Sequence, residues 1–150
     1  GHGTSHTANV SYDQMQTQME DLGFTNAFIG TVEGEPEDTE CQAVIAKVKD
    51  AGFKKVVLRP LMVVAGDHAN NDMAGDDDDS WKSQFDASGA FDSVDCQIAG
   101  LGRIEAVEDL YVEHTKAAID SLGTADTAEE TTDDTAEAAD DSAETTEEAE

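Results

Sequence analysis

Three apolar runs along the chain predict buried β-strands. The strongest covers residues 55–64 (KVVLRPLMVV), where Pro60 indicates a bend or an unpaired edge near the end of the strand. A second run covers residues 26–32 (NAFIGTV), and a weaker one covers residues 91–98. A polar loop follows each of the first two runs, as expected where a chain leaves a strand.

Around these strands, apolar residues recur at the spacing of amphipathic helices. Glycines mark the ends of two predicted helices, at Gly23 and Gly52, and Asp38 or Thr39 is the expected N-cap of the second. Acidic residues crowd the first turn of the third predicted helix, which suits the helix dipole. The predicted helices cover residues 10–22, the segment from Thr39 to Gly52, residues 77–88 and residues 104–122.

Strands that alternate with helices predict an α/β domain. We expect an open parallel sheet with helices on both faces and right-handed crossovers, spanning residues 1–122. The first motif, GHGTSH at residues 1–6, is of a kind that follows a strand, so we expect the first strand of this domain to precede Gly1. In open α/β folds, the loops at the strand ends build the functional site.

Residues 123–150 differ in composition from the rest of the chain. They hold 12 of the 35 acidic residues, no Lys or Arg, and no aromatic residue. Such a segment buries too little apolar surface to offset its ordering entropy, so we expect a disordered acidic tail. The formal net charge of −27 opposes nucleic-acid binding. No sequence pattern predicts a nucleotide cofactor or a membrane span.

Cysteine usage and the N-terminus bear on the cellular compartment. Cys41 and Cys96 are the only cysteines and lack C-x-x-C spacing. Two unpaired structural thiols are expected, with a disulfide as the alternative if the fold joins them. No signal peptide is visible in a chain that starts without Met. A cytoplasmic location is the default expectation, and an exported or periplasmic location is the alternative.

Candidate metal ligands follow the strands in three motifs. These are GHGTSH at residues 1–6, GTVEGEP at 30–36 and VAGDHANNDMAGDDDDSWKS at 64–83. They are expected to bring His2, Glu33 and His68 to one rim of the sheet. Two imidazoles and a carboxylate suit Co²⁺, Ni²⁺, Fe²⁺ or Zn²⁺. Asp67 and Asp72 could orient His68, because a ligand histidine usually donates its other N–H to an oxygen acceptor.

The motif set resembles that of the anaerobic sirohydrochlorin cobaltochelatases of cobalamin biosynthesis, which are class II chelatases. The matching stretches are GHGTSH with Tyr12, FIGTVEGEP, LRPLMVVAGDHANNDMAGDDDDSWKS, and GLG followed by YVEH at 111–114. The resemblance covers roughly residues 1–120. It implies a lyase that inserts Co²⁺ into sirohydrochlorin. It also implies two α/β halves that face each other, of which this chain would be the C-terminal one, with the N-terminal half missing.

The resemblance assigns roles to individual residues. His2 matches the first histidine of the family's H-G-T motif, which binds the incoming metal and helps to remove pyrrole protons. His68 is the second implied catalytic residue and metal contact, and Glu33 is the third metal contact. The residues themselves suggest further roles: Trp81 belongs either to the core or to a stacking surface for a flat macrocycle, and the candidate counter-charges for the polycarboxylate substrate are Lys82, Arg59 and Arg103. The candidate substrate-binding residues are His6, Trp81 and Lys82.

Two further functions fit the same residues. One is a non-catalytic metal- or haem-binding protein of an exported chelatase-like type, in which the acidic tail is a spacer. The other is a metal-dependent hydrolase, although the first motif lacks the D-x-H pattern of many two-metal phosphoesterases. A second α/β half upstream would favour the chelatase, and a signal peptide there would favour the exported protein. Assembly into a homo-oligomer is left open.

Overall fold

The computed structural model describes the backbone of residues 1–129 and the side chains of residues 1–123. The chain divides into two units, Gly1–Glu108 and Asp109–Glu150. The first unit contains the sheet and all three motifs of the candidate site. Most of the tail predicted for residues 123–150 lies outside the described residues, so its disorder stays a prediction.

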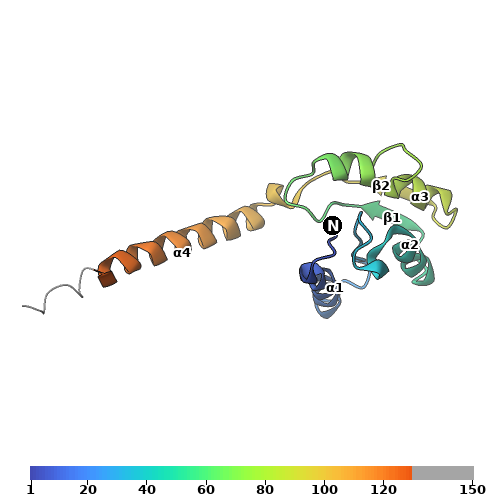
Figure 1. Ribbon diagram of the computed structural model, residues 1–150. Helices are drawn as coiled ribbons and strands as arrows, with labels where there is room; N and C mark the ends of the chain where they lie inside the picture. Colours follow the sequence, from blue (N-terminus) through green and yellow to red (C-terminus); the bar gives the residue numbers. More distant parts are fainter. Residues whose placement is uncertain (130–150) are drawn as a thin grey trace, which may run out of the picture. The chain divides into compact units, whose positions relative to one another are not determined.

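The first unit is an α/β fold with a parallel sheet flanked by helices, which confirms the predicted fold class (Figure 1). Strands β1 (Lys55–Leu58) and β2 (Ser93–Cys96) pair in parallel, with Lys55 opposite Ser93 and Leu58 opposite Cys96. The connection between them runs through α3 (Trp81–Ala87), which contacts both β2 and α2 (Cys41–Asp50).

Strand β1 is shorter than the predicted strand over residues 55–64. It ends at Leu58, because Pro60 has no N–H to continue the ladder and fixes its own φ angle. The two chain segments nevertheless stay together beyond the sheet. The Leu101 N–H donates to the Met62 carbonyl at 2.8 Å, so the polar loops after the two strands remain side by side.

The strand predicted over residues 26–32 is wrong, because this segment forms no regular strand in the structure. Its backbone groups find other partners. Gln16 of α1 (Val10–Asp21) accepts from the Ile29 N–H at 2.8 Å and donates to the Ala27 carbonyl at 3.1 Å. Gly1 and His2 run beside the end of the segment, where the Thr31 N–H donates to the Thr39 carbonyl at 2.8 Å. A ladder requires a neighbouring strand along its length, and an apolar run does not by itself supply one.

Two predicted helix starts are also wrong. Helix α3 begins at Trp81 rather than at residue 77, because Ser80 is its N-cap and accepts from the Ser83 N–H at 3.1 Å. Helix α2 begins at Cys41 and not directly after Asp38 or Thr39, since Thr39 lies in the 3₁₀ turn Glu37–Thr39. Helix α1 ends at Asp21, one residue before the predicted end at residue 22, and Gly23 follows its C-cap, Leu22, with a φ of 86°.

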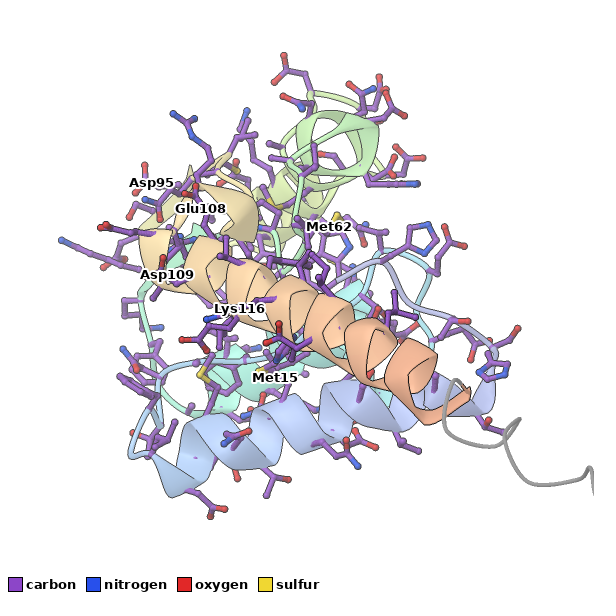
Figure 2. The ribbon with its side chains drawn as sticks, turned by 90° about the vertical axis from the view of Figure 1, so that its left-hand side faces the viewer. Met15, Met62, Asp95, Glu108, Asp109 and Lys116 are labelled. Carbon is purple, nitrogen blue, oxygen red and sulfur yellow. The ribbon has the colours of Figure 1, made fainter. Side chains whose placement is uncertain are left out.

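Helix α4 (Glu105–Glu129) forms where a helix was predicted over residues 104–122, and it continues further. Figure 2 shows the side chains along it, among them Asp109 and Lys116. None of the helices within residues 1–129 is both long enough and apolar enough to cross a membrane. The large exposed apolar side chains of α4 are Leu110, Tyr111, Val112, Ile119 and Leu122.

The hydrophobic core packs α2 and α3 against one face of the sheet. Phe85 is its most deeply buried large side chain, and its ring stacks between those of Trp81 and Phe91. Val57 of β1 points to the opposite face of the sheet and is 62% exposed. The buried core residues are Cys41, Val44, Ile45, Val48, Leu58, Met73, Trp81 and Phe85.

Both cysteines are free thiols in the structure, as the sequence predicts. Burial, helped by the neighbouring Glu40 carboxylate, raises the pKa of the Cys41 thiol from 9.0 to about 12. Because the thiolate is the reactive form, we expect Cys41 to react with a thiol reagent at pH 8 more than about tenfold more slowly in the native chain than in urea. Mass spectrometry of the labelled chain measures both rates. Equal rates in the two conditions would contradict the burial of this thiol.

Candidate metal site

The backbone pairing of the N-terminal residues sets His2 beside Glu33. The Val32 N–H donates to the Gly1 carbonyl at 3.0 Å, and the Glu33 N–H donates to the His2 carbonyl at 2.9 Å. His2 and Glu33 therefore lie opposite each other on two neighbouring chain segments, and their side chains start close together. Their Nε2 and Oε1 atoms lie 3.9 Å apart.

Gly3 permits this close approach of the two loops. Its φ is +98°, and a Cβ atom there would lie 2.9 Å from the Glu33 Cβ and 3.1 Å from the Thr31 Cβ. Any larger residue would strain the backbone and push the loops apart. The Gly3 N–H also donates to the Tyr12 hydroxyl at 2.9 Å, so α1 helps to fix the His2 loop.

Two buried threonines shape the loop that carries Glu33. The Thr31 and Thr39 hydroxyl oxygens lie 2.6 Å apart, and the Thr31 hydroxyl accepts from the Glu35 N–H at 3.1 Å. From the sequence, Thr39 was expected only as a helix N-cap, and Thr31 was not identified. The signal was a polar residue, Thr31, inside an apolar run, since a buried hydroxyl needs a defined partner.

His68 precedes a single π-helical turn, Ala69–Met73, which the sequence did not predict. Its Nδ1 atom lies 2.5 Å from the Asp72 Oδ2 atom. The other acid considered, Asp67, instead accepts from the Asn71 side chain at 2.7 Å. π-Helical turns are rare and occur often at functional sites. In this chain, the π-helical turn places the Asp72 carboxylate against the His68 ring.

The structure brings the three predicted metal ligands together. The rings of His2 and His68 lie edge to face, with centroids 4.5 Å apart and planes at 88°, and Glu33 is next to His2. All three side chains are about half exposed. As they lie, however, no three His, Cys, Asp or Glu side chains among residues 1–123 form a ready-made metal site. Coordination by all three residues stays a prediction and requires rotation of exposed side chains.

The predicted substrate-binding residues lie in three different environments. His6 is exposed and accepts from the Ala8 N–H at 3.1 Å, which caps the 3₁₀ turn Thr7–Asn9. Lys82 pairs with Asp76 at 3.0 Å, which raises the pKa of the lysine. Trp81 is only 9% exposed and packs in the core, as one of the two predicted alternatives states. Contact of any of them with substrate stays a prediction.

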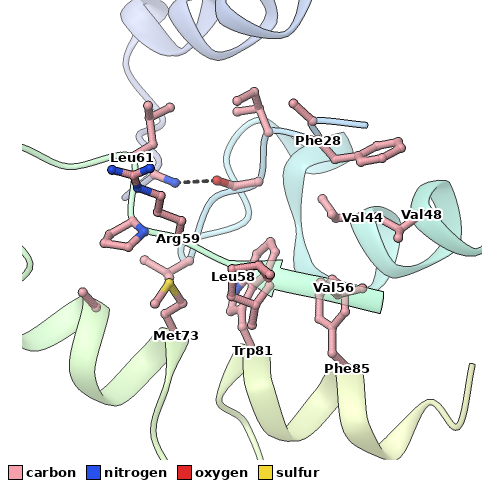
Figure 3. A pocket seen from close by; sticks show the side chains of 18 of the residues that line it. Phe28, Val44, Val48, Val56, Leu58, Arg59, Leu61, Met73, Trp81 and Phe85 are labelled. Atoms are coloured by element: carbon pink, nitrogen blue, oxygen red, sulfur yellow. Dashed lines mark hydrogen bonds between the residues drawn. The ribbon is translucent and has the colours of Figure 1, made fainter. Parts of the chain in front are cut away.

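Two hollows adjoin the site. An apolar cavity of about 660 Å³ lies between residues 26–32, α2 and β1, and Trp81 and Phe85 form part of its wall (Figure 3). His68 also lines this cavity. A second, more polar hollow of about 480 Å³ includes Glu33 and Asp72. The candidate ligands thus lie where solvent and small ions have access.

Comparison with known proteins shows to which protein family the chain belongs. The family model described as "Cobalt chelatase (CbiK)" matches residues 1–120. The chain belongs to the cobalt chelatase (CbiK) family. This match covers all three loops that carry His2, Glu33 and His68.

Two curated relatives agree with the cobalt chelatase family. The chain is 41% identical over 119 residues to a sirohydrochlorin cobaltochelatase of Salmonella typhimurium, covering 79% of this chain and 43% of the relative. It is 34% identical over 124 residues to the sirohydrochlorin cobaltochelatase CbiKC of Nitratidesulfovibrio vulgaris, covering 81% of this chain and 41% of the relative. The matches thus span about two-fifths of the length of these relatives.

Proposed function

We propose that this cobalt chelatase chain contributes to the insertion of Co²⁺ into sirohydrochlorin, a lyase step of anaerobic cobalamin biosynthesis. The observation that supports it most directly is the edge-to-face contact of His2 and His68 beside Glu33. These residues come from three loops that lie within the family match. The names of the two relatives point to the same metal and the same tetrapyrrole.

The proposed mechanism follows from what insertion requires. Two pyrrole N–H protons leave the macrocycle while the metal exchanges its waters for pyrrole nitrogens. Each neutral imidazole of His2 and His68 would bind the cation through one nitrogen, and that nitrogen becomes free to accept a pyrrole proton as the metal passes to the macrocycle. Glu33 supplies an oxygen ligand and lowers the net charge of the site. Because the site is half exposed, one side of the metal stays open to the macrocycle.

The substrate needs more surface than these loops present. The relatives are more than twice as long as the matched segment, so we propose that a second α/β half closes the substrate cleft. We further propose that Ni²⁺, Fe²⁺ or Zn²⁺ can replace Co²⁺ at the site, because ligands of these types do not select strongly among such metals. Parallel insertion assays with each metal compare their rates.

The decisive experiment mixes the protein that includes the proposed second half with sirohydrochlorin and Co²⁺ and follows the absorbance of the tetrapyrrole. We expect the spectrum to change to that of the cobalt complex at a rate proportional to protein concentration. Dialysis against Co²⁺ in the same buffer measures metal binding alone. Binding of Co²⁺ without faster insertion would contradict the chelatase and support the non-catalytic metal-binding alternative.

Replacing Glu33 with Gln is expected to slow insertion by about tenfold, less than loss of either histidine. The substitution removes the charge but keeps a side-chain oxygen at the same position. Initial rates at saturating Co²⁺ measure the effect. Glu37→Gln, which removes an exposed charge in the following 3₁₀ turn, is the matched control and should leave the rate unchanged. Equal losses in the two variants would show a general charge effect instead.

A further inference from the structure

The two imidazoles of the candidate site share one hydrogen-bonding feature. The His68 Nδ1 atom contacts the Asp72 carboxylate at 2.5 Å, and the His2 Nδ1 atom contacts the Gly3 carbonyl at 2.9 Å. A carboxylate and a backbone carbonyl only accept hydrogen bonds. When the rings are neutral, each Nδ1 therefore carries the proton, and each Nε2 carries the free lone pair.

We propose that Asp72 is a positioning residue that holds His68 as its Nδ1–H tautomer and so presents Nε2 to the incoming metal. The inference rests on the proposed function, since it assigns a role within the same site. Asp72 itself stays outside the coordination sphere. Its carboxylate orients the ring and makes the Nε2 lone pair a stronger donor, as oxygen acceptors behind ligand histidines do elsewhere.

The local fold explains why Asp72 and not Asp67 has this role. Ala69 and Met73 are buried and anchor the π-helical turn on the protein. His68 and Asp72 lie four residues apart on its exposed side and are paired there. The Asp67 carboxylate is occupied by the Asn71 amide. The turn thus holds the histidine and its acceptor as one unit.

His6 provides an internal reference. Its Nδ1 atom accepts from the Ala8 N–H at 3.1 Å, so its neutral ring must carry the proton on Nε2. The same loop region therefore contains a histidine with the opposite tautomer. A single spectrum of the full 150-residue chain can distinguish the two assignments.

The first test is long-range ¹H–¹⁵N NMR of the imidazoles in the metal-free chain, at a pH where the rings are neutral. We expect His68 to show Nδ1–H and His6 to show Nε2–H. In Asp72→Ala, His68 should change to mainly Nε2–H, the form that an unconstrained imidazole favours. Asp72→Asn should retain Nδ1–H, because the amide oxygen still accepts. An unchanged His68 tautomer in Asp72→Ala would overturn the proposal.

The second test is Co²⁺ affinity, measured by calorimetric titration with the metal alone. Asp72→Ala should weaken binding by about 10–100-fold and Asp72→Asn by less. Asp67→Asn, which removes the same charge one turn away, should change affinity less than twofold. Circular dichroism confirms that each variant is folded. Equal affinity losses in Asp72→Ala and Asp67→Asn would overturn the proposal, because they would show an effect of net charge.

These measurements separate the inference from the proposed function. The tautomer and the Co²⁺ affinity are read without sirohydrochlorin. If the protein with both halves inserts no cobalt but this chain shows the expected Asp72 effects, the chelatase is contradicted and the positioning role is retained. A chain that inserts cobalt while Asp72→Ala leaves tautomer and affinity unchanged retains the chelatase and loses the positioning role.

Discussion

Replacing either His2 or His68 with Ala is expected to abolish cobalt insertion into sirohydrochlorin, with a loss of at least about 10²-fold in initial rate. Each substitution removes a proposed metal contact and a proposed proton acceptor in one step. The two rings lie edge to face, with centroids 4.5 Å apart, so neither can substitute for the other without moving. The absorbance change of the tetrapyrrole on metal insertion measures the rate.

His114→Ala is the matched control for these two substitutions. His114 is an exposed histidine on α4 and belongs to none of the three site loops. We expect its loss to leave the insertion rate within about twofold of the parent chain, because an exposed surface substitution away from the site has little effect. Near-normal rates in both His2→Ala and His68→Ala would refute the assignment of the chemistry to these residues.

Replacing Phe85 with Ala is expected to lower the free energy of unfolding by about 3–5 kcal/mol. The side chain is 1% exposed, and its ring centroid lies 6.0 Å from that of Trp81 and 5.4 Å from that of Phe91. Truncation removes these contacts and leaves a cavity between α3 and the sheet. Urea unfolding followed by circular dichroism measures the unfolding midpoint and slope, from which the change in the free energy of unfolding follows.

Phe24→Ala is the control for this core substitution. Phe24 is 53% exposed and follows α1, so its truncation should change the unfolding free energy by no more than about 0.5 kcal/mol. A destabilisation by Phe85→Ala no larger than that of Phe24→Ala would mean that the described core does not limit the stability of the first unit.

The motifs of the sequence predicted correctly that His2, Glu33 and His68 lie together, but only part of the reasoning holds. Loops after parallel strands meet at one edge of a sheet, and His68 does follow β1. Residues 26–32 form no strand, and backbone hydrogen bonds between the loops of His2 and Glu33 bring these two residues together instead. The fold class, the extent of α1 to within one residue and the family resemblance depend on local signals, and the structure or the comparisons confirm them.

Only the tertiary structure decided which partners the polar groups choose. Residues 26–32 have the composition of a strand, but a strand forms only beside another strand, and here Gln16 bonds to the backbone instead. Asp67 precedes His68 by one residue and Asp72 follows it by four, and the sequence does not decide which of them orients the histidine. In the structure the His68 ring contacts Asp72, and Asp67 bonds to Asn71 instead. Trp81 was as well suited to a binding surface as to the core, and packing against Phe85 places it in the core. Apolar periodicity is a property of short segments, whereas the choice of a hydrogen-bond or packing partner depends on which segments the fold brings within reach.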